Sequence, residues 1–139
     1  VHPEFRAFVE ASPGMASFTT FTAAVPHDVL LNMYGKSSLL LIILTGYKDA
    51  EGYMPGKLFE YLATGLPIFG TGPEHGDAAG VLKETGAGVM LEEIHHKKIQ
   101  ATLLTLYQEW KKGETNFKSP ADTKYSRKEI TRRLTELLQ

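Results

Sequence analysis

One loop and the helix start that follows it carry residue types suited to binding a nucleotide. The segment TGYKDAEGYMPGKLFEYLATGLP, residues 45–67, runs from a glycine-bearing loop into a helical pattern. Pro55 suits the first turn of that helix and offers no amide. The first free amides would then be those of Gly56, Lys57 and Leu58. Such a helix N-terminus stabilises a phosphate through backbone hydrogen bonds and the helix dipole.

Two charged side chains near this helix start extend the same chemistry. Lys57 is unfavourable against the dipole unless an anion lies nearby. Glu60, one turn further on, projects to the same rim, and a carboxylate there can accept two hydrogen bonds from a ribose cis-diol. The simpler interpretation is an ordinary surface pair between Lys57 and Glu60, because such pairs are common on helices. These residues taken alone leave both interpretations open.

Short apolar runs alternate with helical patterns along the chain. Strands are predicted at 37–46 (buried on both faces), 67–71, 88–91 and 15–23. Helices are predicted at 26–34, 55–64, 76–85, 94–110 (its apolar stripe in the core) and about 125–138. This alternation implies parallel strand pairing. We therefore expect an α/β fold, a Rossmann-like three-layer sandwich with a mainly parallel sheet, whose ligand lies outside the carboxyl ends of the strands.

Composition sets the limits of this interpretation. The 139 residues suit one domain, and 15 Lys plus Arg against 16 Asp plus Glu offer no case for nucleic-acid binding. Without cysteine there is no disulfide framework or thiolate metal site. The longest aliphatic run is about a third of the roughly 20 residues that cross a bilayer. A soluble cytoplasmic domain is the expectation.

The stretch EGYMPGKLFEYLATGLPI, continuing to GPEHGDAAGVLKETGAGV, resembles the donor-site region of GT-B fold glycosyltransferases. It is most similar to the large retaining family (glycosyl transferases group 1) that builds bacterial polysaccharide and lipopolysaccharide from nucleotide-activated sugars. The resemblance is densest over about residues 24–90. It implies that residues 1–139 are a single donor-binding domain, one half of a GT-B fold, truncated at its N-terminus. Such a domain would be inactive without the missing N-terminal acceptor domain. That domain would bind the glycan or lipid-linked acceptor to which the sugar is transferred.

The resemblance also implies roles for individual residues. Glu60 matches the family's ribose-binding Glu, and Glu51 is the candidate for the Glu that faces the donor sugar. Eight residues separate Glu51 from Glu60, where the common pattern has seven. The loop from Val25 to His27 would lie beside the nucleobase, largely through main-chain contacts. No catalytic residue, metal or cofactor is implied; the nucleoside-diphosphate sugar is the donor substrate.

Other residues admit simpler interpretations. Asp77 is expected to cap the helix at 76–85. The adjacent His95 and His96 would point about 100° apart on a helix, which favours a solvated pair over a shared metal site. The apolar stripe of the last helix would lack its partner domain and leave a patch for self-association. The full enzyme could also contact the inner membrane face peripherally, with the basic residues of this helix attracted to anionic lipid.

Three rival functions belong to other classes. A non-catalytic module with a degenerate donor site would bind a partner glycosyltransferase through its last helix. A fragment of a nucleotide-sugar epimerase would share the GT-B architecture but needs acid and base residues that are not evident here. A receiver-like domain would need an acidic cluster at the strand ends, for which Asp49 and Glu51 in one loop are a poor match.

Overall fold

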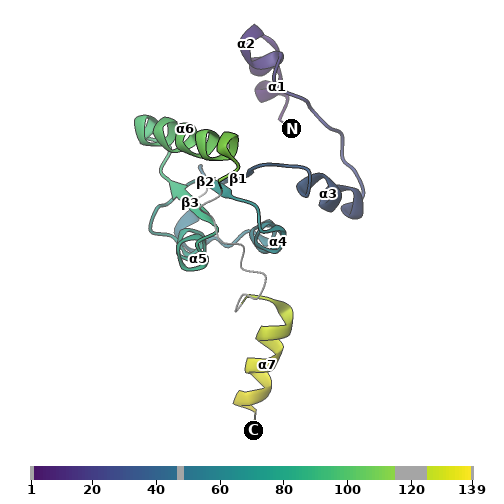
Figure 1. Ribbon diagram of the computed structural model, residues 1–139, viewed down its shortest axis with the longest axis vertical. Helices are drawn as coiled ribbons and strands as arrows, with labels where there is room; N and C mark the ends of the chain where they lie inside the picture. The colour runs from purple at the N-terminus through teal and green to yellow at the C-terminus, as the bar shows by residue number, and fades with distance from the viewer. Residues whose placement is uncertain (1, 47–48, 115–124, 139) are drawn as a thin grey trace. The chain divides into compact units, whose positions relative to one another are not determined.

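The computed structural model describes residues 2–46, 49–114 and 125–138 (Figure 1). The chain divides into two compact units, Val1–Asn32 and Met33–Gln139. No helix within the described ranges has both the length and the apolar character needed to cross a membrane.

The first unit is helical. It contains α1 (Pro3–Glu10), α2 (Pro13–Ala16) and the beginning of α3 (His27–Tyr34). Val9 is its buried centre, at 1% exposure. The ring of Phe5 meets Phe21 edge-on, with 6.4 Å between the centroids. One aromatic contact therefore joins α1 to the segment that follows α2.

The strand predicted at residues 15–23 is wrong. Met15 lies in α2, and the rest of this segment contains no strand. The Thr19 hydroxyl donates to the Met15 carbonyl at 2.8 Å, and Phe18 is 91% exposed. Threonine and phenylalanine favour strands only where a neighbouring strand accepts their backbone hydrogen bonds and packs their side chains. The described part of this unit offers no such neighbour.

The second unit is α/β and contains a small open sheet of three parallel strands. These are β1 (Leu40–Ile43), β2 (Ile68–Thr71) and β3 (Gly88–Leu91), in the order β1-β2-β3. In register, Leu40 lies opposite Ile68, which in turn lies opposite Gly88. The predicted positions of β2 and β3 are confirmed, and so is the parallel pairing.

Helices connect the strands. They are α4 (Gly56–Thr64), α5 (Asp77–Thr85), α6 (His96–Lys112) and α7 (Arg127–Leu137), with a short 3₁₀ turn, η1 (Ala50–Gly52), before α4. Both α4 and α5 end at a glycine in the left-handed region, Gly65 at φ 71° and Gly86 at φ 65°, where a side chain would be strained. In Figure 1, α6 lies on one side of the sheet and α4 and α5 on the other.

The main core lies between the sheet and the helices α4 and α5. Its most deeply buried side chains come from β1, β2, α4 and α5. They are Ile42, Ile68, Leu58 and Leu82, each at 0% exposure. The strand β1 was predicted to be buried on both faces, and this is wrong. Leu41 and Ile43 are about half exposed and alternate with buried Leu40 and Ile42. The described residues therefore cover one face of β1 and leave its second face largely open.

The apolar stripe of α6 was predicted to lie in the core, and the structure corrects this as well. Leu103 is 37% exposed, and Tyr107 and Trp110 are each 53% exposed. Only part of the stripe faces the sheet, with Ile99 and Leu106 intermediate in exposure. Helical periodicity identifies an apolar face but does not determine how completely a neighbour covers it.

Candidate functional site

A pocket of about 280 Å³ lies at the carboxyl ends of the three strands. Its lining comes from the residues that follow each strand together with η1: Leu44, Thr45, Gly46, Ala50, Glu51, Gly72, Pro73, Glu92, Glu93 and Ile94. In open parallel sheets this edge is where ligands bind, because strand ends and helix N-termini converge there. The predicted location of a ligand site therefore contains a pocket, and three carboxylates line it.

Glu51 lies at this pocket because its loop packs against the start of α5. The N-cap residue of α5 is Gly76, and a Cβ there would lie 2.8 Å from the Glu51 carbonyl oxygen and 3.1 Å from its Cα. Only glycine allows the two backbones to approach this closely. The predicted cap, Asp77, is instead the first residue of α5, and no side chain caps this helix. A cap would have required Asp77 to precede the first helical residue.

The N-terminus of α4 offers two of the three amides that were expected. Its N-cap is Pro55, and the amides of Gly56 and Lys57 meet no acceptor among the described residues. The Leu58 amide donates to the Pro55 carbonyl at 3.0 Å, and the Leu58 side chain is fully buried. Leu58 is therefore not a free donor, which corrects the expectation. The tight first turn satisfies its amide within the helix.

Lys57 and Glu60 lie one turn apart on the side of α4 that does not enter the core. Leu58, Tyr61 and Leu62 occupy the core side. Lys57 is exposed and Glu60 is partly buried. Burial raises the pKa of the Tyr61 phenol, and the neighbouring Tyr34 and the charge of Glu60 raise it further. Glu60 and Tyr61 are neighbours in α4, with Glu60 partly buried and Tyr61 in the core.

The structure separates the predicted site residues into three groups. Glu51 lines the pocket at the strand ends, whereas Gly56, Lys57, Leu58 and Glu60 are not among the residues that line it. These four lie in α4, in the same compact unit as the pocket. The third group belongs to the first unit: Val25 is partly buried in the loop before α3, and His27 is the exposed first residue of that helix.

A cluster around Glu74 was missed by the sequence reasoning. The Glu74 side chain, 19% exposed, accepts hydrogen bonds from the Lys98 ammonium at 2.8 and 3.0 Å and from His95 Nδ1 at 3.0 Å. It also accepts from the Glu92 amide at 3.3 Å. The hydrogen bonds from Lys98 and His95, followed by that of the Glu92 amide, lower the pKa of Glu74 to about 2. Glu74 therefore ties the loop after β2 to the loop after β3 and to the start of α6.

The His95 contact also changes one prediction. His95 is bound to Glu74 and is not simply solvated, and it is the N-cap residue of α6. The separations of 21 and 24 residues explain the omission, since no local pattern reports such pairs. The available signal was an acidic residue placed just after a predicted strand.

Comparison with family models, curated proteins and solved structures finds no match. Within the described ranges, no group of three or more His, Asp and Glu side chains is placed to hold a metal ion. The charged side chains that line the pocket at the strand ends are the carboxylates of Glu51, Glu92 and Glu93, which can accept hydrogen bonds from hydroxyl groups. The amides of Gly56 and Lys57, unpaired among the described residues, and the Lys57 ammonium suit an anion, and they lie at the start of α4 and outside this lining.

Proposed function

We propose that this chain is the nucleoside-diphosphate-sugar-binding part of a glycosyltransferase that acts on a glycan or lipid-linked acceptor. The observation that carries the proposal is the placement of Glu51 in a pocket at the carboxyl edge of a parallel sheet, in the loop that leads into α4. The similarity of the KLFEYLATGLPI segment to donor sites supports it. The finer fold proposed here is a Rossmann-like three-layer sandwich that forms one half of a GT-B enzyme.

Each predicted residue has a role in this proposal. The amides of Gly56 and Lys57 and the Lys57 ammonium bind the diphosphate, because a helix N-terminus stabilises negative charge. The Glu60 carboxylate accepts hydrogen bonds from the ribose hydroxyls. Glu51 lies toward the sugar. Leu58 contributes indirectly, since its buried side chain fixes the first turn of α4 against the core.

Main-chain contacts between the nucleobase and the loop of Val25 and His27, which belongs to the first unit, stay a prediction from the resemblance. During transfer, negative charge develops on the leaving diphosphate. Preorganised amides and a nearby ammonium stabilise that charge without a metal ion, and this is commonly the largest catalytic contribution. The acceptor and any general base belong to the acceptor domain, so turnover is expected only from the complete enzyme.

A ¹H–¹⁵N NMR titration with UDP, GDP and ADP tests the proposal. One of the three nucleotides should shift amides at 56–61, and Glu60→Gln should abolish these shifts. The matched control is Glu4→Gln on α1, whose carboxylate is 91% exposed and should leave the response unchanged. The absence of shifts at millimolar nucleotide in a folded sample would contradict the proposal.

One observation favours a second candidate, a non-catalytic module that binds a partner glycosyltransferase. The apolar stripe of α7 is exposed, as an unoccupied partner surface would be. If this second candidate is correct, none of the three nucleotides should shift any amide. Adding a partner enzyme should then shift amides of α7 alone, so the nucleotide and partner titrations together separate the two functions.

A further inference from the structure

The last helix presents an apolar stripe that no described residue covers. Ile130 and Leu134 are 52% and 56% exposed, and Leu137 and Leu138 are 84% and 79% exposed. The helix itself is well formed, since the Ser126 side chain caps it by accepting from the Glu129 amide at 3.1 Å. The stripe follows the i, i+4, i+7 spacing with which amphipathic helices bind apolar grooves.

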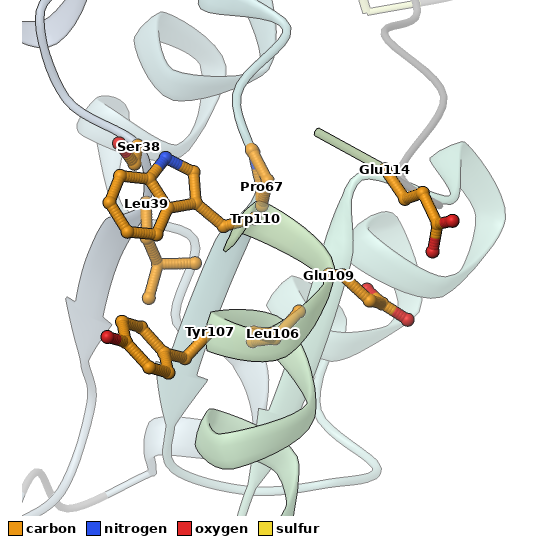
Figure 2. Close-up of a pocket in the computed structure, with 8 residues that line it drawn as sticks. All are labelled: Ser38, Leu39, Pro67, Leu106, Tyr107, Glu109, Trp110 and Glu114. Atoms are coloured by element: carbon orange, nitrogen blue, oxygen red, sulfur yellow. The ribbon is translucent and has the colours of Figure 1, made fainter. Parts of the chain in front are cut away.

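A second apolar surface lies at the amino ends of β1 and β2, opposite the pocket at the carboxyl ends. It is a pocket of about 280 Å³, called here the aromatic pocket, lined by Ser38, Leu39, Pro67, Leu106, Tyr107, Glu109, Trp110 and Glu114 (Figure 2). The rings of Tyr107 and Trp110 lie 5.8 Å apart between centroids and are half exposed. Figure 2 shows both rings and Leu39 gathered together, with the carboxyl groups of Glu109 and Glu114 lying away from the rings. Its lining is mainly apolar and aromatic, which suits aliphatic side chains.

The charges beside the two surfaces are complementary. Glu109 and Glu114 line the aromatic pocket. On α7, Arg132 and Arg133 pair with Glu129 at 2.6 and 2.9 Å, and Arg132 also pairs with Glu136. Arg127 and Lys128 have no carboxylate partner within the described ranges. The first turn of α7 therefore presents positive charge to a partner, next to its apolar stripe.

A residue just before the chain's own α7 is held on the side of the sheet opposite α6, whereas α6 supplies both rings of the aromatic pocket. The Tyr125 ring lies 5.9 Å from that of Phe59 on α4, and its hydroxyl donates to Glu84 on α5 at 2.7 Å. Both helices lie on the face of the sheet opposite α6 (Figure 1). An α7 that docked against its own α6 would have to release Tyr125 from these contacts. A second chain meets no such constraint.

We propose that α7 of one chain docks its apolar stripe into the aromatic pocket of a second copy, with Arg127 and Lys128 beside Glu109 and Glu114. Each chain carries both surfaces, so the contact can be made twice about a two-fold axis and the dimer is closed. The dimer leaves the pocket at the carboxyl ends of the strands outside the interface, so it goes beyond the proposed nucleotide-binding function and does not depend on it.

A lipid surface fits α7 less well. Helices that lie on membranes usually carry a strongly cationic polar face. Two of the four cations of α7, Arg132 and Arg133, are paired with its own Glu129, so its polar face is mixed in charge. These features favour a protein surface of opposite charge.

Analytical ultracentrifugation of the full chain over a concentration series tests this proposal. The wild type should show a concentration-dependent monomer–dimer equilibrium. Leu134→Glu on α7 and Trp110→Glu on α6 should each weaken dimerisation at least tenfold, since each places a charge in an apolar contact. Leu137→Glu is a second α7 variant at an 84% exposed position, which leaves folding intact. Thr135→Glu, at an exposed position about 115° around the helix from the centre of the apolar stripe, is the matched control and should dimerise as the wild type does.

The decisive experiment mixes Leu134→Glu with Trp110→Glu. A chain with an intact α7 and a chain with an intact pocket can still form one of the two contacts, so the mixture should associate more strongly than either variant alone. No gain on mixing would overturn the proposal in favour of an α7–α7 or α6–α6 contact. A wild type that is monomeric at every concentration would also overturn it, as would an α7 that binds anionic vesicles while the chain stays monomeric.

Discussion

Replacing Gly76 with alanine tests whether the approach of the Glu51 loop to α5 is as close as the structure shows. The added Cβ would lie 2.8 Å from the Glu51 carbonyl oxygen, 3.1 Å from its Cα and 3.3 Å from the Pro73 Cβ. Ordinary contact begins at 3.4 Å, so the loop must move by about 0.6 Å. Overpacking of this kind costs about 1–3 kcal/mol, and losing a glycine N-cap adds a little more. We expect Gly76→Ala to lower the free energy of unfolding by this amount.

The matched control is Gly80→Ala on the same helix. A Cβ at Gly80 meets no atom within 4 Å, and alanine is a better helix residue than glycine by about 1 kcal/mol. This variant should be neutral or stabilising. Urea denaturation followed by circular dichroism measures the free energy of unfolding of both variants. Equal effects of the two substitutions would refute the close approach of the Glu51 loop to Gly76.

Three further predictions concern stability. The pKa of Glu74 is lowered to about 2, so its contribution to stability is present above its ordinary value of 4.5 and is lost as pH falls toward 2. Glu74→Gln should therefore reduce the acid dependence of the melting temperature; Glu129, which titrates in the same range, remains in both proteins and cancels in the difference. Leu58→Ala should cost about 2–5 kcal/mol by denaturant titration, whereas the exposed Leu104→Ala should cost far less. Ser126→Ala should weaken α7 by about 1 kcal/mol, seen as faster amide exchange in that helix and unchanged exchange in β2.

Elements whose limits depend on local chemistry were predictable. The apolar runs that form β2 and β3 are bounded by proline and glycine, and the helices α4 and α5 end at glycines whose backbone few other residues adopt. These signals lie within a few residues of the feature they determine. The parallel pairing followed from the alternation of strands with helices.

Features that depend on distant neighbours were not predictable. A strand at residues 15–23 required a neighbouring strand that the described first unit lacks, and the burial of α6 required a cover that the sheet only partly provides. The same holds for the candidate site. The position of Glu51 could be inferred from its loop, but its support by Gly76 depends on a contact between segments 25 residues apart in the chain. Likewise, nothing near Glu74 in the sequence announces its bonds to α6.

The half-exposed indole of Trp110 is also the chain's sole tryptophan, and this makes the protein its own optical reporter. Emission excited at the indole comes from the lip of the aromatic pocket, at the amino ends of the strands. Burial of this ring would move the emission to shorter wavelength, while a ligand at the opposite edge of the sheet would leave it unchanged. A dilution series without any label can therefore distinguish occupancy of one edge of the sheet from occupancy of the other.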